Sequence, residues 1–89
     1  MIDTVESNSE FLTSDTPLAA YLIQEGFELL IIQYETKQNG KQRATYIFQT
    51  SPQLKHNVSL YNRGEATINI ALYEHAKNSL LDRVMRGLP

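Results

Sequence analysis

Residues 29–49, with the sequence LLIIQYETKQNGKQRATYIFQ, decide the fold of this chain. Residues 29–34 form a short apolar run with β-branched residues at its centre, which is typical of a strand rather than a helix. Asn39-Gly40 is a strong hairpin signal because a tight two-residue turn favours these residues at positive φ. Residues 41–49 return as a second strand with Thr45 to Phe48 at its centre. The stretch therefore predicts an antiparallel β-hairpin.

A two-residue turn also determines which residues of the hairpin face one another. The expected pairs are Gln38 with Lys41, Tyr34 with Thr45, Ile32 with Ile47 and Ile31 with Phe48. One face of the sheet then carries Leu29, Ile31, Tyr46 and Phe48, and the other carries Leu30, Ile32, Tyr34 and Ile47. Both faces are therefore expected to be apolar near the base of the hairpin.

The second apolar face needs a cover of its own. Helices can cover one face of a small sheet, and an exposed patch of Leu30, Ile32, Tyr34 and Ile47 predicts an interface with a partner protein or with a second copy of this chain. The alternative is that one helix crosses to the second face and completes a three-layer monomer. The residues alone leave both arrangements open.

Two helices are marked by start and stop signals. Ser14-Asp15-Thr16-Pro17 combines capping side chains with a proline in the first turn, and Gly26 is expected to end that helix. Ser51-Pro52 opens a second helix by the same logic, and Gly64 closes it. These signals are local, so they predict the helix boundaries without any knowledge of the packing.

A third helix completes the expected fold. Its apolar positions recur at helical spacing, at Tyr73, Ala76, Leu80, Val84 and Leu88. Asn69 is one candidate for its N-cap. With a short extended piece over residues 10–13, the expected order is (β)αββαα. This is an α+β fold in which about three helices pack on a small antiparallel sheet.

Length and composition limit the domain organisation and the compartment. The chain has 89 residues, so we expect an acidic, disordered arm over residues 1–9 and a single compact domain over residues 10–89. The longest runs of hydrophobic residues, such as Leu18 to Ile23 and Leu29 to Ile32, are much too short to cross a bilayer. The chain has no cysteine, which excludes disulfides and thiolate chemistry. A cytoplasmic protein without membrane contact is expected.

The net charge of -2 hides a steep gradient along the chain. Residues 1–35 contain seven acidic and no basic side chains, whereas residues 36–64 contain five basic and no acidic ones. The basic residues are Lys37, Lys41, Arg43, Lys55 and Arg63, and they form a candidate patch for nucleic acid or for an acidic partner. Lysines on exposed strands also serve simply to prevent edge pairing. We interpret the acidic side chains of residues 1–35 mainly as a solubilising arm and a helix cap. The alternative is that their carboxylates mimic a phosphate backbone and bind a partner in that way.

Nothing in the chain resembles a catalytic or cofactor motif. His56 and His75 have no metal-ligand spacing, and no serine lies in a nucleophile-elbow pattern. The glycines do not form a phosphate-binding loop. We therefore expect a protein that is not an enzyme and has neither cofactor nor metal. A pocket converging on His56 or His75 would favour the opposite conclusion.

A longer pattern resembles a known family. It consists of Thr13-Ser14-Asp15, Leu18-Ala19-Ala20-Tyr21-Leu22, Gly26-Phe27, Tyr46-Ile47-Phe48, Ser51-Pro52-Gln53-Leu54, Tyr61 and Gly64. This pattern is similar to that of small phage and bacterial proteins catalogued as a domain of unknown function. The resemblance implies a phage or mobile-element context and supplies no catalytic residues. By analogy with other small phage proteins, it implies binding to a host protein or nucleic acid, including inhibition of a host system.

These observations lead to two functional hypotheses. The first is a small, non-enzymatic binding protein that acts through protein–protein contacts and self-associates, in the simplest case as a homodimer. The alternative is a small nucleic-acid-binding protein that uses the basic hairpin tip and the second helix.

Overall fold

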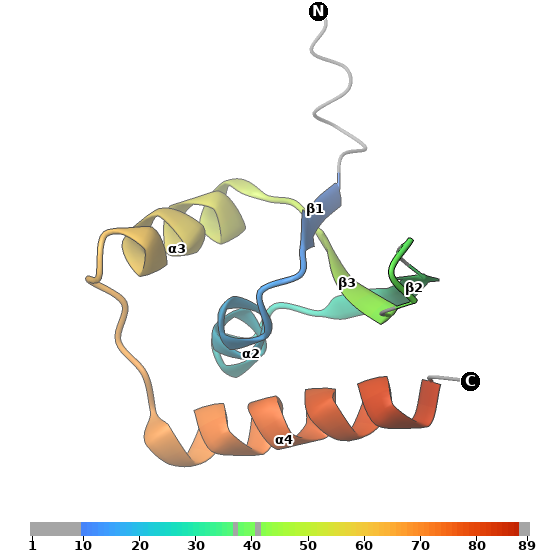
Figure 1. The fold of residues 1–89 in the computed structure, drawn as a ribbon. Helices are drawn as coiled ribbons and strands as arrows, with labels where there is room; N and C mark the ends of the chain where they lie inside the picture. Colours follow the sequence, from blue (N-terminus) through green and yellow to red (C-terminus); the bar gives the residue numbers. More distant parts are fainter. Residues whose placement is uncertain (1–9, 37, 41, 88–89) are drawn as a thin grey trace, which may run out of the picture.

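The computed structural model describes residues 10–36, 38–40 and 42–87. Its elements are β1 (Glu10–Thr13), α2 (Thr16–Gln24), β2 (Leu29–Thr36), β3 (Gln42–Gln49), α3 (Pro52–Asn62) and α4 (Ile70–Gly87) (Figure 1). The strands form an antiparallel sheet in the order β1-β3-β2. The predicted α+β fold and its element order are therefore confirmed. The predicted acidic arm, residues 1–9, lies outside the described residues.

The predicted caps begin all three helices. Asp15 accepts a hydrogen bond from the backbone N–H of Leu18 at 3.2 Å, and Ser51 accepts one from the N–H of Leu54 at 3.1 Å. Asn69 does the same for Leu72 at 3.0 Å. Each cap satisfies an N–H that the first turn of a helix would otherwise leave without a partner.

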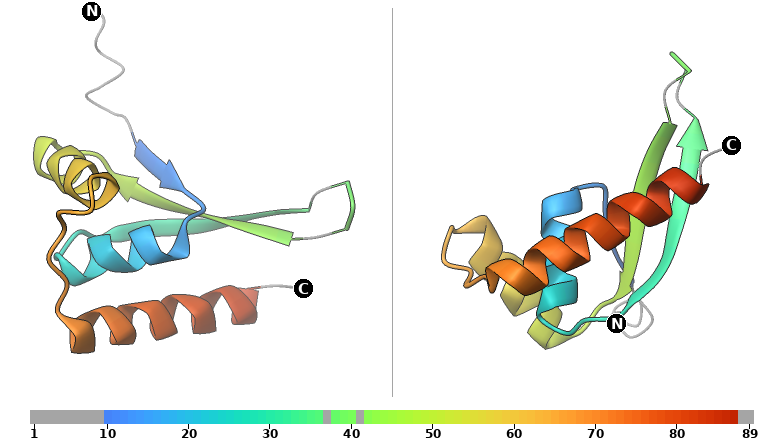
Figure 2. Two further views of the ribbon diagram at one scale, coloured as in Figure 1. Left: turned by 60° about the vertical axis from the view of Figure 1, so that its left-hand side comes forward. Right: turned by 90° about the horizontal axis from the view of Figure 1, so that it is seen from below.

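Helix α2 is the centre of the core. Its residues Leu18 to Leu22 are at most 6% exposed. They pack against Tyr46 and Phe48 of the middle strand β3, and against Ala76 and Leu80 of α4. Figure 2 shows α2 and α4 on the same side of the sheet. Helix α3 contacts α2, and its Leu54 joins the same cluster.

The hairpin is present, but its register differs from the expected one by one residue. Ile32 pairs with Tyr46 and Tyr34 with Ala44, and the innermost pair is Thr36 with Gln42. The loop is therefore longer than two residues, and within its described part only Gly40 has a positive φ, of +84°. Side chains alternate between the two faces along a strand. A shift of one residue in the pairing therefore moves every side chain of one strand to the opposite face of the sheet relative to the other strand. The observed register gathers Ile32, Tyr46 and Phe48 on the face covered by helices.

The pairing of β2 with β3 contains an irregularity at its start. Leu29 pairs with Phe48, but Ile31 pairs with Ile47, so Leu30 is the additional residue between the two pairs. In a regular strand, residues two apart lie on the same face. Here the extra residue places Leu29 against the core, whereas Ile31 lies beside Ile47 on the other face. The prediction that Leu29 and Ile31 share a face is therefore wrong.

A polar network fastens α4 to the end of α2. The side-chain oxygen of Gln24 accepts a hydrogen bond from the backbone N–H of Asn69 at 3.2 Å, and its amide nitrogen donates to Glu25 at 2.7 Å. Asn57 of α3 donates to the same carboxylate at 3.1 Å and to the hydroxyl of Tyr21 at 3.2 Å. The three helices are thus linked by hydrogen bonds at one end of the molecule.

Replacing the N-cap of α4 should destabilise the fold. Asn69→Ala removes the side-chain oxygen that accepts from Leu72, and a lost cap typically costs about 1 kcal/mol. Urea unfolding followed by circular dichroism should show a lower midpoint with an unchanged slope. Asn69→Asp keeps an accepting oxygen and should retain most of the stability. An Asn69→Ala midpoint equal to that of the wild type would show that this cap does not contribute.

Two tyrosines of the core resist ionisation. Burial raises the pKa of Tyr21, the nearby carboxylate of Glu25 raises it further, and the hydrogen bond from Asn57 opposes the rise. Burial also raises the pKa of Tyr61, with further contributions from Asp15 and Tyr73. The two rings contact each other with their centroids 5.5 Å apart. The fold therefore keeps both phenols neutral up to a higher pH than in the unfolded chain.

The raised pKa values predict a loss of stability in alkali. A phenol whose pKa is higher in the folded state contributes fully below the ordinary value of 10.0, and the contribution falls as pH rises through the raised value. Unfolding in urea at pH 9 and at about pH 11 should show this fall. Tyr61→Phe has no proton to lose at that position and should show a smaller fall. An equal fall in both proteins would contradict the role of Tyr61.

Candidate functional site

One face of the sheet is not covered by any described helix. We call it the open sheet face. Its apolar centre consists of Leu12, Ile31 and Ile47. The polar residues on the same face, which alternate along the strands with core-facing residues, are Glu10, Gln33, Glu35, Arg43, Thr45 and Gln49. Leu12 and Ile31 pair with Ile47 from either side. They are 52% and 51% exposed, while Ile47 between them is 3% exposed. An exposed apolar pair thus shields a buried isoleucine that lies outside the helix-facing core cluster.

The predicted partner patch is divided between the two faces. Ile32 packs against the core, and the hydroxyl of Tyr34 donates to the backbone carbonyl of Arg83 in α4 at 3.2 Å. Ile47 lies on the open sheet face, and Leu30, at the strand irregularity, is 44% exposed. The grouping of these four residues on one face is wrong because the observed register differs by one residue. Sequence reasoning missed Leu12 and Ile31 as the exposed apolar residues.

The charged residues of the open sheet face lie towards its two ends. Glu10 pairs with Gln49 at the end of β3, whereas Glu35 pairs with Arg43 near its start. The guanidinium of Arg43 donates through Nε to the hydroxyl of Ser14 at 2.9 Å. Acidic and basic groups therefore flank the apolar centre, and neither sign covers the whole face.

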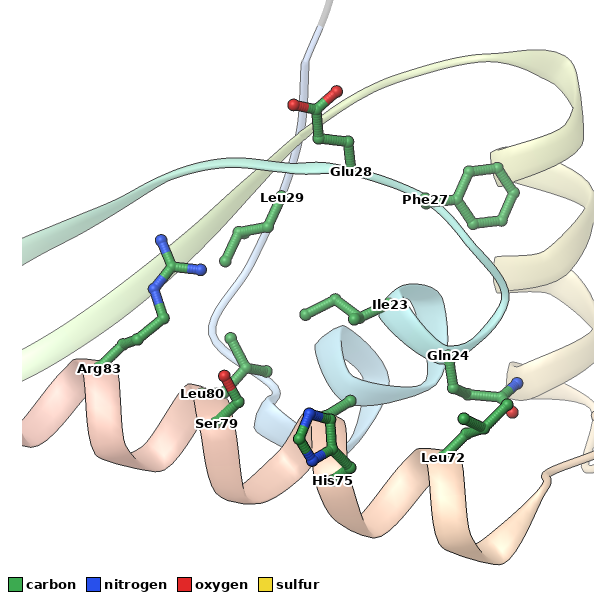
Figure 3. A pocket seen from close by; sticks show the side chains of 11 residues that line it. Ile23, Gln24, Phe27, Glu28, Leu29, Leu72, His75, Ser79, Leu80 and Arg83 are labelled. Atoms are coloured by element: carbon green, nitrogen blue, oxygen red, sulfur yellow. The ribbon is translucent and has the colours of Figure 1, made fainter.

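A cleft opens on the helical side of the molecule, between the end of α2, the loop to β2 and the outer flank of α4. Its volume is about 460 Å³, and it is lined by Ile23, Gln24, Phe27, Glu28, Leu29, Leu72, His75, Ala76, Ser79, Leu80 and Arg83. Figure 3 shows Arg83 at one end of this cleft and Phe27 and Leu72 at the other. The carboxylate of Glu28 points away from α4 at the mouth.

Three polar residues of α4 line one side of the cleft at every fourth position. His75, Ser79 and Arg83 are exposed, and their side chains have no hydrogen-bond or ion-pair partner among the described residues. The neighbouring Arg86, in contrast, forms an ion pair with Asp82 at 3.0 Å. The spacing of four was visible in the sequence, but only the packing of α4 shows that these residues face a cleft.

The predicted basic patch does not form one surface in the described part of the chain. Arg43 lies near the start of β3, whereas Lys55 and Arg63 belong to α3 and its C-cap, which follow the end of that strand. Arg43 and the last residue of β3, Gln49, are six residues apart, which corresponds to roughly 20 Å along the strand at about 3.3 Å per residue. Arg63 also pairs with Glu65 at 3.3 Å. Lys37 and Lys41 lie outside the described residues.

The histidines are not brought together. His56 is exposed on α3, and His75 is exposed on α4 at the cleft. Within the described ranges, no three His, Asp or Glu side chains are close enough to hold a metal ion. The same ranges contain no helix that is both long and apolar enough to span a membrane. His75 thus lies in a cleft, which is the observation that would favour an enzyme. Among the described residues, however, no carboxylate or nucleophile is hydrogen-bonded to its side chain.

Comparison with known proteins agrees with the resemblance read from the sequence. A family described as a domain of unknown function (DUF5659) matches residues 8–86, which include all six helices and strands except the last residue of α4. Neither the search of curated proteins nor the search of solved structures found a match. The match covers most of the chain and confirms the expected uncharacterised family. The chain belongs to the DUF5659 domain family.

Proposed function

We propose that this protein is a small, non-enzymatic binding protein that acts through protein–protein contacts, and that its first partner is a second copy of itself. The observation that carries the proposal is the open sheet face. Leu12 and Ile31 are each about half exposed there, and no described helix packs on them. Contiguous exposed apolar side chains with a polar rim are typical of interaction surfaces.

A second copy suits the distribution of charge on this face. In a two-fold interface the same surface meets itself, so that residue i of one copy contacts residue j of the other and the reverse. A two-fold axis that passes near Ile47 between the two faces and runs across the strands would bring the Glu10 end of one copy to the end of the other that carries Arg43 and Glu35. The apolar centres would then meet, and Leu12 and Ile31 would lose their exposure to water.

The remaining parts of the proposal rest on the residues and on the family resemblance. The absence of a catalytic motif in the sequence supports a role without chemistry. The phage or mobile-element setting and the inhibition of a host system rest on the resemblance alone, and the cytoplasmic location rests on the composition of the sequence, which has no cysteine. The nucleic-acid alternative receives no comparable support, because the described basic residues of that patch, Arg43, Lys55 and Arg63, lie on separate parts of the fold.

Self-association should depend on the open sheet face. Sedimentation equilibrium of the wild type over micromolar concentrations should give a mass near twice 10.2 kDa. Ile31→Glu places a charge in the apolar centre and should shift the protein to the monomer, because an interface does not accept an unpaired buried charge. Since Ile31 is half exposed in one chain, the variant should still fold, which circular dichroism would verify.

Ile70→Glu is the matched control for this experiment. It makes the same chemical change at an isoleucine that is 75% exposed at the start of α4, on the helical side of the molecule (Figure 2). This variant should dimerise like the wild type. A wild type that remains monomeric at all concentrations would overturn the proposal, and so would equal dissociation by the two variants.

A further inference from the structure

We propose that the cleft beside α4 is a binding site for a small carboxylic acid with an apolar body, in which Arg83 receives the carboxylate. The site is separate from the open sheet face and goes beyond the self-association proposed above. Three observations carry it: the apolar residues in the lining of the cleft, the row of three polar residues along α4, and the lack of a partner for Arg83 among the described residues.

The walls of the cleft provide room for an apolar body. Ile23 of α2, Phe27 of the following loop and Leu29 of β2 line the cleft together with Leu72 and Ala76 of α4. A volume of about 460 Å³ falls within the range of about 300–1,000 Å³ that is usual for small-molecule sites. The lining residues come from two stretches of the chain, 23–29 and 72–83, and both stretches also contribute side chains to the hydrophobic core.

The polar groups point to an anion. Arg83 offers a planar set of N–H donors, which match a carboxylate in a two-point contact. Ser79 and His75 continue from it along α4 and add a hydroxyl and an imidazole. Lys77 and Arg86 of the same helix are already paired with Glu74 and Asp82. Arg83 has no such partner within residues 10–36, 38–40 and 42–87, and its donors can therefore be assigned to a ligand.

The order of groups along the cleft gives the ligand an orientation. Arg83 stands at one end, and Phe27 and Leu72 stand at the other, so the carboxylate and the apolar tail would lie at opposite ends. One arginine, Arg83, lines the cleft, so one carboxylate group can be paired there. A single negative charge with an apolar body fits this arrangement best.

Titration with octanoate tests the inference directly, and 1-octanol is its neutral counterpart. We expect saturable shifts of backbone amide signals at Ile23, Leu72 and Ser79 in two-dimensional NMR spectra, and none at Leu12 and Ile31. Arg83→Gln should weaken octanoate binding by about fivefold, the size expected for one exposed charge pair, and leave 1-octanol binding unchanged. Leu72→Ser should weaken both ligands because it removes part of the apolar wall.

Two variants of α4 serve as matched controls. Arg86→Gln removes an arginine of the same helix that is paired with Asp82, and Leu81→Ser removes an exposed leucine that does not line the cleft. Both should bind octanoate like the wild type. The inference is overturned if octanoate causes no saturable shifts at millimolar concentration, if the shifts lie outside the cleft, or if Arg83→Gln and Arg86→Gln bind equally. Binding by the dimer-deficient Ile31→Glu would separate this site from the open sheet face.

Discussion

The pairing of β3 with both of its neighbours is the constraint on which the rest of the structure depends. Phe48 lies opposite Phe11 of β1 and Leu29 of β2, and together with Tyr46 it forms the sheet side of the core. Both residues are buried. Because side chains alternate along a strand, a shift of β3 by one residue would turn both of them to the open sheet face and remove the surface on which α2 packs. Burial of large aromatic side chains therefore selects the register.

The position of α4 follows from that of α2, and it is held at two places. At its start, the backbone N–H of Asn69 donates a hydrogen bond to the side-chain oxygen of Gln24 in α2. Near its end, the carbonyl of Arg83 accepts a hydrogen bond from the hydroxyl of Tyr34. Between these contacts, Ala76 and Leu80 pack on the core and leave the flank with His75, Ser79 and Arg83 beside the cleft. The cleft thus results from the way α4 packs across the core. The hydrogen bonds at the two ends of α4 fix the position of the helix, and with it the position of the residues that line the cleft.

Local signals in the sequence predicted the elements but not their faces. Asp15, Ser51 and Asn69 act as caps within three residues of the N–H groups they satisfy, so their roles are visible without the fold. The register could not be predicted from Asn39-Gly40, because the loop length depends on how distant residues pack. The same holds for Arg83: its spacing from His75 and Ser79 can be counted, but its direction depends on the packing of α4.

The irregularity at Leu30 decides which apolar residues of β2 lie on each face of the sheet. Without it, Leu29 and Ile31 would point to the same side, and Leu30 rather than Leu29 would share the core-facing side with Ile32. The extra residue lets Leu29 line the cleft and contact the core while Ile31 extends the apolar centre of the open sheet face. Bulges of this kind often re-aim side chains at functional positions. The extra residue at the start of β2 therefore places Leu29 beside the cleft that we infer and Ile31 on the self-association surface that we propose.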